Sequence, residues 1–436
     1  MSKPSPCWYC FKKKQLKVSI AVNCDNDIFI TVEQALIRMT QAIQPRLQVE
    51  EIPLEQALGR ILAETIRSPI NVPAYDNSAM DGYALNLSNA AAQSRFDVVS
   101  QILAGKPDDT QLKEGQCARI MTGGKIPQGC DAVVMQENTN IVTDDVIELT
   151  TNVAHGANIR RSGDDIRLGD TVLESARSLT PIDIGCLASL GLQTVKVYQK
   201  ITIGLFTTGD ELAQPGAPLL PGQIYDSNRP MLKALLAKAG FNIVDLGAID
   251  DELEKITQAL DFLAHRCDAI ITCGGVSVGV ADYTGQAFAS LAEIDFWKVA
   301  MKPGKPFAFG RLKKDSRCVY FFGLPGNPVS AAVTYELLAQ PMLKYLSGVD
   351  QGQRTHLKLP TEQAIKKRPG RKDFQRGVLV KDSNGVPMAV VPFAKQSSGV
   401  LSELSQADCL IVLEKERGAV AKGEHVLVMP LTKANL

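Results

Sequence analysis

The middle of the chain has the strongest structural pattern. Between residues 201 and 346, short apolar runs such as "ITIGLFTTG" and "DAIITCGG" alternate with helical patterns such as "DELEKITQALDFLAHR", in which Ile256, Leu260 and Leu263 share one face. Apolar strands that alternate with amphipathic helices predict a doubly wound parallel sheet with helices on both faces. We therefore expect residues 201–346 to form an α/β domain.

The regions on either side have different patterns. A chain of 436 residues is too long for one hydrophobic core, so we expect an α/β multidomain protein. Residues 75–160 contain short strands separated by turns, which predicts a β module. Residues 30–74 and 161–200 contain helical patterns, including "TVEQALIRMTQAI" and "PLEQALGRILAETI", and predict a helical N-terminal linker domain that carries the β module as an insertion. Residues 352–436 predict a compact, all-β, barrel-like domain.

Composition and the N-terminus argue against several classes of protein. Lys+Arg and Asp+Glu both number 47, so the net charge favours neither nucleic acid nor a membrane surface as partner. No apolar run reaches the about 18 residues of a membrane helix. Ten cysteines are typical of a reduced, cytoplasmic protein, because only Cys7 and Cys10 have metal-ligand spacing and no second pair stands near them. Residues 1–29 lack a secretory cleavage pattern, and we expect a flexible extension there.

Loops that follow the strands of the α/β domain carry glycines and acids. Ligands of open α/β sheets bind beyond the carboxyl ends of the strands. Gly274 and Gly275 would let a ligand approach the backbone, and Ser277 offers a hydroxyl. Asn327 and Pro328 are typical of a helix start, behind which free amides can bind an anion. The pattern favours a phosphate-bearing ligand, although ordinary tight turns use the same residues. The loops are 207–212, 247–252, 274–282 and 323–328.

Two acids of these loops lack an obvious structural role. Asp251 and Glu252 open a helix, so stabilisation of the helix dipole explains them at least as well as catalysis does. Glu211 and Asp282 instead close glycine-containing loops, where each would repel a phosphate unless a cation lay between them. No histidine stands near these loops. We therefore expect a hard, oxygen-ligated cation, most simply Mg²⁺.

Basic residues gather in three further segments. Lys298 lies inside the apolar pattern "FWKVAM", where an unpaired ammonium would be costly, and Lys302 adjoins a Pro-Gly turn. An anionic ligand would remove this cost, whereas a solvated surface turn is the alternative. Arg160 stands beside another glycine turn. The segments 368–377 and 395–399 add basic and hydroxyl residues in the last domain.

Two loops of the β module have an unusual composition. "PAYDNSAMDGYAL" at 73–85 places Asp81 among polar residues, a methionine and two aromatics, and "RIMTGG" places Thr122 before two glycines. Such loops are commonly functional, with a structural turn of Asp and Asn side chains as the alternative. Both loops suit a ligand rich in oxygen.

Together these motifs resemble the molybdopterin molybdenumtransferase family, which includes the bacterial MoeA enzymes and the E domain of gephyrin. The resemblance extends over roughly residues 30–430. Two features depart from the family pattern. One is the extension before Ile30, and the other is Cys130, which stands where a small residue is usual. The matching strings are "DNSAMDGYA", "RIMTG", "DAVVMQE", "NIRRSGDDI", "TTGDEL", "GQIYDSNRPML", "GGVSVGVADY", "MKPGKPFAFG" and "GLPGNPVSAAV".

The resemblance implies a fold and a reaction. It implies an L-shaped homodimer of four-domain subunits with a central molybdopterin-binding domain. The active cleft would lie between this domain of one subunit and the β module of the other. The implied reaction inserts molybdate into adenylylated molybdopterin, with Mg²⁺, and releases AMP and the molybdenum cofactor. The molybdopterin adenylyltransferase and apo-molybdoenzymes become candidate partners.

The resemblance also assigns site residues. The acidic and hydroxyl catalytic set is Asp81, Thr122, Asp165, Glu211, Asp251 and Asp282. Glu211 and Asp282 become the metal ligands. The residues for molybdopterin, AMP or molybdate are Gly274, Gly275, Ser277, Lys298, Lys302, Pro325, Gly326, Asn327, Pro328, Arg160, Arg376 and Ser398.

Two other functions remain open from the sequence. The single-domain molybdopterin adenylyltransferases resemble residues 201–346 alone, with the same "GGVSVG" and "LPGNP" features. The gephyrin E domain also serves as a non-enzymatic scaffold. The flanking domains favour the molybdenumtransferase over the first alternative, and the retained acids and lysines favour it over the second.

Overall fold

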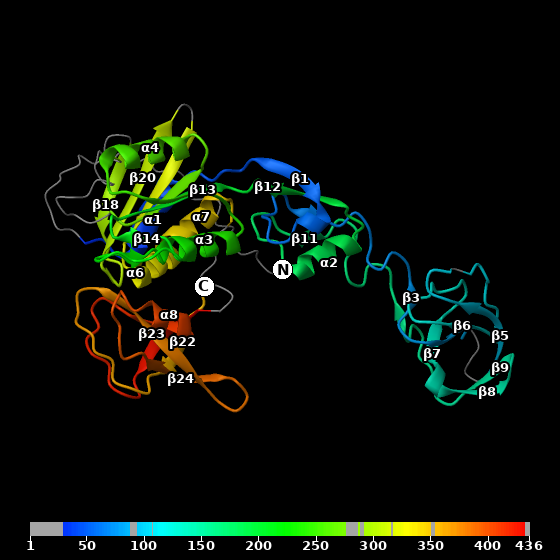
Figure 1. Cartoon of the computed structure of the whole chain (residues 1–436). Helices are drawn as coiled ribbons and strands as arrows, with labels where there is room; N and C mark the ends of the chain where they lie inside the picture. Colours follow the sequence, from blue (N-terminus) through cyan, green and yellow to red (C-terminus); the bar gives the residue numbers. More distant parts are fainter. Residues whose placement is uncertain are drawn as a thin grey trace, which may run out of the picture.

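The structure is a computed structural model that describes residues 29–87, 94–106, 108–275, 287, 292–314, 317–349 and 354–431. Ser277 and Asp282 lie outside the described residues, as does the expected extension apart from Phe29. Figure 1 shows an elongated chain with the α/β and C-terminal domains at one end and the β module at the other.

The α/β domain contains one large sheet with the strand order β16-β13-β17-β21-β20-β18. β13, β16, β17 and β21 are mutually parallel, as the alternating pattern predicted. The strands are β13 (Thr202–Thr208), β16 (Asn242–Ile249), β17 (Ala269–Cys273), β18 (Ala292–Lys298), β20 (Pro306–Lys314) and β21 (Arg317–Leu324). The short strands β14 (Leu212–Ala213) and β15 (Ile224–Tyr225) pair beside it.

β18 and β20 make the sheet mixed, which the sequence analysis did not predict. β20 pairs antiparallel with β21 and with β18. Only two residues separate Lys314 from Arg317, and a parallel crossover needs about a dozen or more. The short connection therefore forces an antiparallel pair.

Helices cover both faces of this sheet because side chains of each strand alternate between two cores. Leu205 of β13 packs with Leu236 and Leu343 on one face, and Phe206 packs with Leu260 on the other. The helices are α3 (Asn228–Lys238), α4 (Leu253–Ala264), α6 (Pro328–Thr334) and α7 (Gln340–Leu346), with a π-helical turn at Tyr335–Ala339.

The first helix, α1 (Val32–Ala42), belongs to the α/β domain rather than to the predicted linker domain. Thr31 caps it in the predicted capping box with Gln34. Ala35 and Met39 are fully buried in the same core as Leu343. The expected boundary at residue 30 therefore differs from the structure, since residues 30–43 add a helix to the core of the α/β domain.

The linker domain contains more strand than helix. The second predicted helix, at 53–66, is wrong beyond the 3₁₀ turn at Leu54–Gln56. Gly59 has a positive φ of 72°, and Leu62 bridges to Val197, so tertiary pairing overrides the helical pattern. The other elements are β1 (Val49–Pro53), β2 (Ile66–Arg67), β11 (Thr171–Leu173), α2 (Pro181–Ser189) and β12 (Thr194–Tyr198).

The β module is a sheet with the order β7-β4-β6-β5-β9-β8 and small cores on both sides. It is joined to the linker domain by two chain segments, which pair through β3 (Asn77–Ser78) and β10 (Ile159–Arg160). The sheet strands are β4 (Gly82–Leu85), β5 (Arg95–Ile102), β6 (Gln116–Ile120), β7 (Ala132–Met135), β8 (Thr139–Thr143) and β9 (Val146–Leu149), with a 3₁₀ turn at Gln136–Asn138.

In its described residues the C-terminal domain is β-rich, as predicted, and has one short helix. Its sheet includes β19 (Met301–Lys302) from the α/β domain, which pairs in parallel with β23. This pairing holds the last domain against the loop that carries Lys302. The elements are β22 (Leu357–Pro360), β23 (Lys372–Lys381), β24 (Pro387–Pro392), α8 (Leu401–Gln406), β25 (Cys409–Leu413) and β26 (His425–Pro430).

Candidate active site

The loops predicted to bind a ligand begin side by side at one edge of the large sheet. Thr207 pairs with Cys273, and Cys273 pairs with Leu324, so β13, β17 and β21 end in register. The segments that follow these strands are the predicted glycine and acid loops. Parallel register therefore brings together segments more than a hundred residues apart.

Gly274 must be glycine for steric reasons. Its φ is 102°, and a Cβ added there would stand 2.4 Å from the carbonyl oxygen of Thr208. Gly275 also has a positive φ, of 61°. The chain thus leaves β17 pressed against β13 on two residues without side chains, as the glycines predicted.

The turn after β21 is fixed by groups from three other segments. Asn228 donates from Nδ2 to the carbonyl oxygen of Gly326 at 2.6 Å, and Cys273 donates from Sγ to the carbonyl oxygen of Pro325 at 3.0 Å. The amide of Val329 donates to the carbonyl oxygen of Ser398 at 3.0 Å. The expectation that the amides behind "GNP" are free is therefore wrong for Val329.

Three acids gather where the neighbouring strands β13 and β16 end. The amide of Asp251 donates to Oδ1 of Asp210 at 3.1 Å, and the carboxylate of Glu211 folds over Gly209, 2.7 Å from where a Cβ would stand. Burial raises the pKa of Asp251, and the charges of Asp210 and Glu211 raise it further. Oδ1 of Asp251 is buried without a hydrogen-bond partner among the described residues. The arrangement is strained by like charge, which a cation would relieve.

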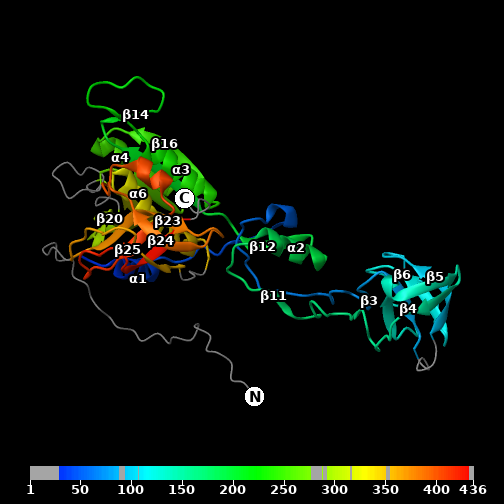
Figure 2. The ribbon, with the colours of Figure 1, turned by 90° about the horizontal axis from the view of Figure 1, so that it is seen from below.

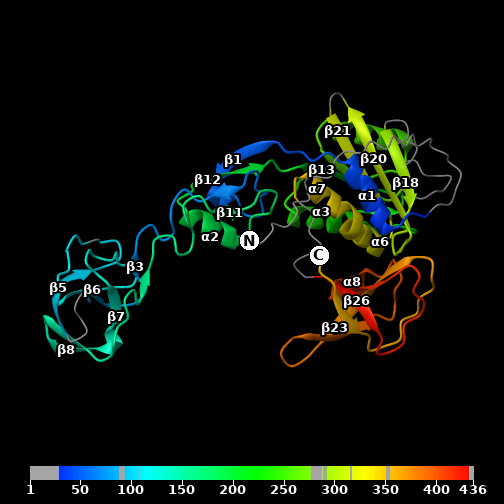
Figure 3. The same cartoon turned by 180° about the vertical axis from the view of Figure 1, so that it is seen from behind.

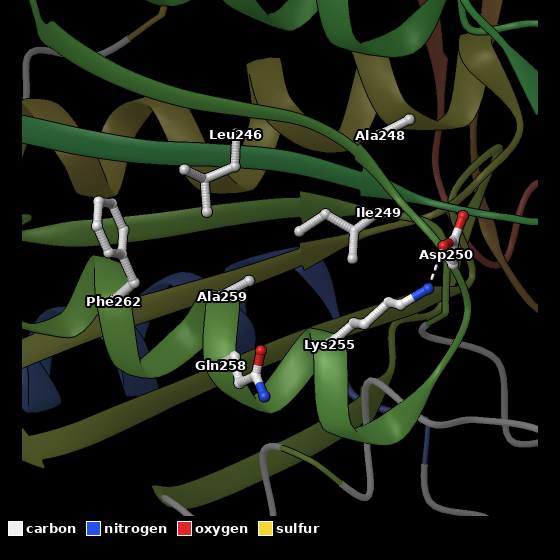
Figure 4. Close-up of a pocket in the computed structure, with 8 residues that line it drawn as sticks. All are labelled: Leu246, Ala248, Ile249, Asp250, Lys255, Gln258, Ala259 and Phe262. Carbon is white, nitrogen blue, oxygen red and sulfur yellow. Dashed lines mark hydrogen bonds and ion pairs between the residues drawn. The ribbon is translucent and has the colours of Figure 1, made fainter.

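The adjacent acids have a structural partner instead. Lys255 forms ion pairs with Asp250 and with Glu252, and these partners raise its pKa. Figure 4 shows Lys255 reaching Asp250 at the rim of a hollow of about 480 Å³ between β16 and α4. Leu246, Ile249 and Phe262 line this hollow, so it is mainly an apolar groove beside the acid cluster.

The predicted lysines lie on a segment clamped between two parts of the chain. The amide of Ile30 donates to the carbonyl oxygen of Lys298 at 3.2 Å, and Lys302 pairs with Asp373 of the C-terminal domain. At the turn between them and β20, a Cβ on Gly304 would stand 2.4 Å from Cγ2 of Thr334. Backbone pairing and a close glycine contact thus fix the positions of both lysines.

Arg376 is a buried residue rather than a solvated one. It is 1% exposed, and Nη2 donates to the carbonyl oxygen of Ser397 at 3.2 Å and to that of Lys395. Oε2 of Glu403 lies 3.6 Å from Nη2 of Arg376. Burial lowers the pKa of Arg376, and Glu403 opposes that change. The structure therefore joins Arg376 to the loop that holds Ser398, whose carbonyl contacts α6.

The remaining predicted residues form a second group in and beside the β module. Thr122 donates from its amide and from Oγ1 to Oδ1 of Asp81, each at 2.7 Å. Arg160 pairs with Asn77 in the connecting segments, and the amide of Asp165 donates to the carbonyl oxygen of Val72 at 3.0 Å. Arg160 and Asp165 are exposed.

The two groups lie far apart within one chain. Figures 1 and 2 show the linker domain between the β module and the α/β domain, and the view from behind in Figure 3 agrees. A single chain in this conformation does not bring Asp81 and Thr122 to Glu211 and Asp251.

Two residues that contribute to the ligand edge of the sheet were not predicted from the sequence. Asn228 is the first residue of α3, which has Ser227 at its N-cap position without a side-chain cap hydrogen bond, and the Asn228 side chain binds the turn. Cys273 is the last residue of β17. Cys273 ends a strand at the predicted ligand edge, which was the available signal for it, whereas Asn228 follows β15, outside the large sheet. Among the described residues, no group of three or more His, Cys, Asp or Glu is arranged to hold a metal ion.

Comparisons with known proteins identify the family. Models of the MoeA N-terminal region (domains I and II), of a probable molybdopterin-binding domain and of the MoeA C-terminal region (domain IV) match residues 30–191, 204–345 and 358–431. The molybdopterin molybdenumtransferase of Haemophilus influenzae is 42% identical over 402 residues, which cover 92% of this chain and 98% of that protein. The chain belongs to the MoeA family of molybdopterin molybdenumtransferases.

Other members of the MoeA family agree in sequence and in fold. The molybdopterin molybdenumtransferase of Nostoc is 34% identical over 91% of this chain and 92% of that protein. A crystal structure of the MoeA protein from Pyrococcus horikoshii, 26% identical, has a TM-score of 0.78 and covers 93% of this chain and all of that one. The predicted family, enzyme class and multidomain architecture are therefore confirmed. Among the described residues, no helix has the length and apolar character to cross a membrane.

Proposed function

We propose that this enzyme inserts molybdate into adenylylated molybdopterin, releasing AMP and forming the molybdenum cofactor in the last step of its biosynthesis. Family membership supports this reaction. The observation that carries it is the juxtaposition of an acid cluster (Asp210, Glu211 and Asp251) with the uncovered backbone at Gly274. Acids beside a close backbone approach suit a phosphate that arrives with a cation.

The acid cluster has the donor chemistry of a magnesium site. Its side chains offer only oxygen donors, and Oδ1 of Asp251 has no hydrogen-bond partner among the described residues. We assign Mg²⁺ to Glu211 and Asp282. Magnesium, when bound, would neutralise the charge of the phosphoanhydride. Asp251 would remain an ionised acid beside it, because the cation opposes the repulsion from Asp210 and Glu211.

The basic residues would bind the anions of the reaction. Lys298 and Lys302 lie on the rigid segment that joins the α/β and C-terminal domains. Arg376 is held by backbone carbonyls close to Ser398, and Nε of Arg376 has no hydrogen-bond partner within the described part of the chain. A preorganised set of cationic donors lowers the energy of a molybdate dianion or a departing phosphate without reorganising during the reaction.

We further propose a homodimer in which each active site is shared. Asp81, Thr122, Arg160 and Asp165 belong to or adjoin the β module, which extends away from the α/β domain of its own chain. A two-fold dimer would place the module of one subunit over the sheet edge of the other. Each site would then contain Asp81 and Thr122 from one chain and Glu211 and Asp251 from its partner.

AMP release tests the proposed reaction. Purified protein is given adenylylated molybdopterin and Mg²⁺, with and without molybdate, and the product is tested for activation of an apo-molybdoenzyme. Molybdate-dependent AMP release and active cofactor are expected. Conversion of ATP and molybdopterin to the adenylylated form, without AMP release in the first assay, would instead indicate an adenylyltransferase. If a folded protein catalysed neither reaction, a scaffold function would remain.

We place the enzyme in the cytoplasm, which is supported by the free state of every cysteine in the described residues.

A further inference from the structure

Two side chains hold the turn between β21 and α6 from its inner side. Nδ2 of Asn228 donates to the carbonyl oxygen of Gly326 at 2.6 Å, and Sγ of Cys273 donates to the carbonyl oxygen of Pro325 at 3.0 Å. Asn228 begins α3, and Cys273 ends β17. The two consecutive carbonyl groups are therefore directed toward the protein.

The planarity of the peptide bond then fixes the direction of the amides. In a trans peptide the N–H points opposite to the C=O, and the peptides of this turn are trans. The amides of Gly326 and Asn327 must therefore point away from Cys273 and Asn228. Within the described residues, neither amide donates to a backbone acceptor. Two successive outward amides are available as donors to an anion.

Other contacts near the turn agree with this function. The amide of Val329 is occupied by Ser398, so the turn rather than the following helix offers the open donors. A Cβ on Gly326 would stand 3.9 Å from Cα of Gly274, and the pair of glycines leaves the gap between them uncovered. Oδ1 of Asn228 is buried without a partner among the described residues. The Asn228 side chain therefore forms its hydrogen bond to Gly326 although its own Oδ1 stays unpaired, which costs free energy.

We propose that Asn228 is a positioning residue, assisted by Cys273, which holds the turn so that the amides of Gly326 and Asn327 bind the phosphate of the adenylyl group. This inference rests on the proposed function, because that function supplies the phosphate. Asn228 itself acts through the backbone of the turn. Replacing it should therefore weaken the recognition of phosphate and leave recognition of the nucleoside intact.

Binding of AMP and of adenosine to the full-length protein, measured by calorimetry, separates these two effects. Asn228→Ala should weaken AMP binding about tenfold, the effect of losing roughly one hydrogen bond, with adenosine binding unchanged. Cys273→Ala should act in the same direction, whereas Cys273→Ser keeps a donor and should bind AMP like the wild type. Cys267→Ala is the matched control, since Cys267 is a buried thiol of the same domain that does not contact the turn. Thermal melting of each variant checks the fold.

Each outcome bears on the proposal. Selective loss of AMP affinity in Asn228→Ala and in Cys273→Ala, with wild-type affinity in Cys273→Ser, supports it. Equal weakening of AMP and adenosine, or unchanged AMP affinity, overturns the positioning role even when the wild type releases AMP in the molybdate assay. A wild type that binds no AMP overturns the inference as well, and the molybdate assay then decides separately whether the proposed function also fails.

Discussion

Thr122 donates two hydrogen bonds to one carboxylate oxygen of Asp81, from its amide and from its hydroxyl, each at 2.7 Å. These bonds hold the pKa of Asp81 below its usual value, first through the backbone of Thr122 and then through its side chain. Asp81 is exposed on the β module. An ionised acid held in one orientation at a surface is prepared for a ligand that another part of the assembly brings to it.

Asp81→Asn should lower the rate of AMP release at least about a hundredfold, the usual effect of removing a catalytic acid or base. Because Asp81 is exposed, the melting temperature should change little. Asp108→Asn is a close control, since Thr110 of the same module donates to Asp108 from its amide and hydroxyl in the same way. Comparable losses of the AMP-release rate in both variants would mean that the Asp81–Thr122 pair supports only the structure of the β module.

Gly274→Ala should destabilise the α/β domain by about 2–3 kcal/mol, because the added methyl group overlaps a neighbouring backbone atom. The contact would be 2.4 Å from the carbonyl oxygen of Thr208. Gly240→Ala isolates the backbone strain, since Gly240 has a φ of 83° and no atom within 4 Å of the added Cβ. It should cost only about 1 kcal/mol. Urea denaturation measures the free energy of unfolding of both variants. Equal losses would contradict a steric overlap between the added methyl group and Thr208.

Acid should weaken the attachment of the β module to its connecting segments. The amide of Ser162 and the guanidinium of Arg161 hold the pKa of Asp76 below its usual value. A carboxylate with a lowered pKa stabilises the folded state above its unfolded pKa of about 3.9, and this stabilisation is lost as the pH falls through the folded pKa. The stability difference between the wild type and Asp76→Asn should therefore be largest near neutral pH and disappear in acid. A difference that stays constant between neutral and acidic pH would contradict this.

Removal of magnesium should abolish AMP release, and added Mg²⁺ should restore it. Glu211→Gln should raise the Mg²⁺ concentration needed for half-maximal activity about tenfold or more, as loss of a charged ligand does. Glu252→Gln is the control, since Glu252 is paired with Lys255 in the same region. A shift of equal size in both variants would contradict a specific metal role for Glu211.

Local patterns predicted the fold where packing agreed with them. The α/β domain followed from strands and helices that each bury one regular face, such as Leu205 and Phe206 on opposite sides of β13. The helix predicted at 53–66 failed because Leu62 pairs with Val197, far away in sequence. The sequence could not predict to which domain α1 belongs, because an amphipathic pattern does not show against which hydrophobic core the helix packs.

The candidate site was predictable in composition but not in arrangement. Glycines at strand ends indicated a close approach, and Gly274 confirms it. The roles of Asn228 and Cys273 depend on contacts with a turn about a hundred or about fifty residues later in the chain. Lys255 forms an ion pair with Asp250 and not with Asp251. The spacing in the sequence could not predict which of these two neighbouring acids its ammonium would reach.

The shared active site is tested most directly by mixing two inactive variants. Asp81→Asn and Glu211→Gln are unfolded and refolded separately and as an equal mixture. Random two-fold pairing makes half of the dimers mixed, each with one intact site, so the mixture should recover about a quarter of the wild-type rate of molybdate-dependent AMP release. A mixture that stays as inactive as the separate variants, although mixed dimers have formed, would contradict a site shared between subunits.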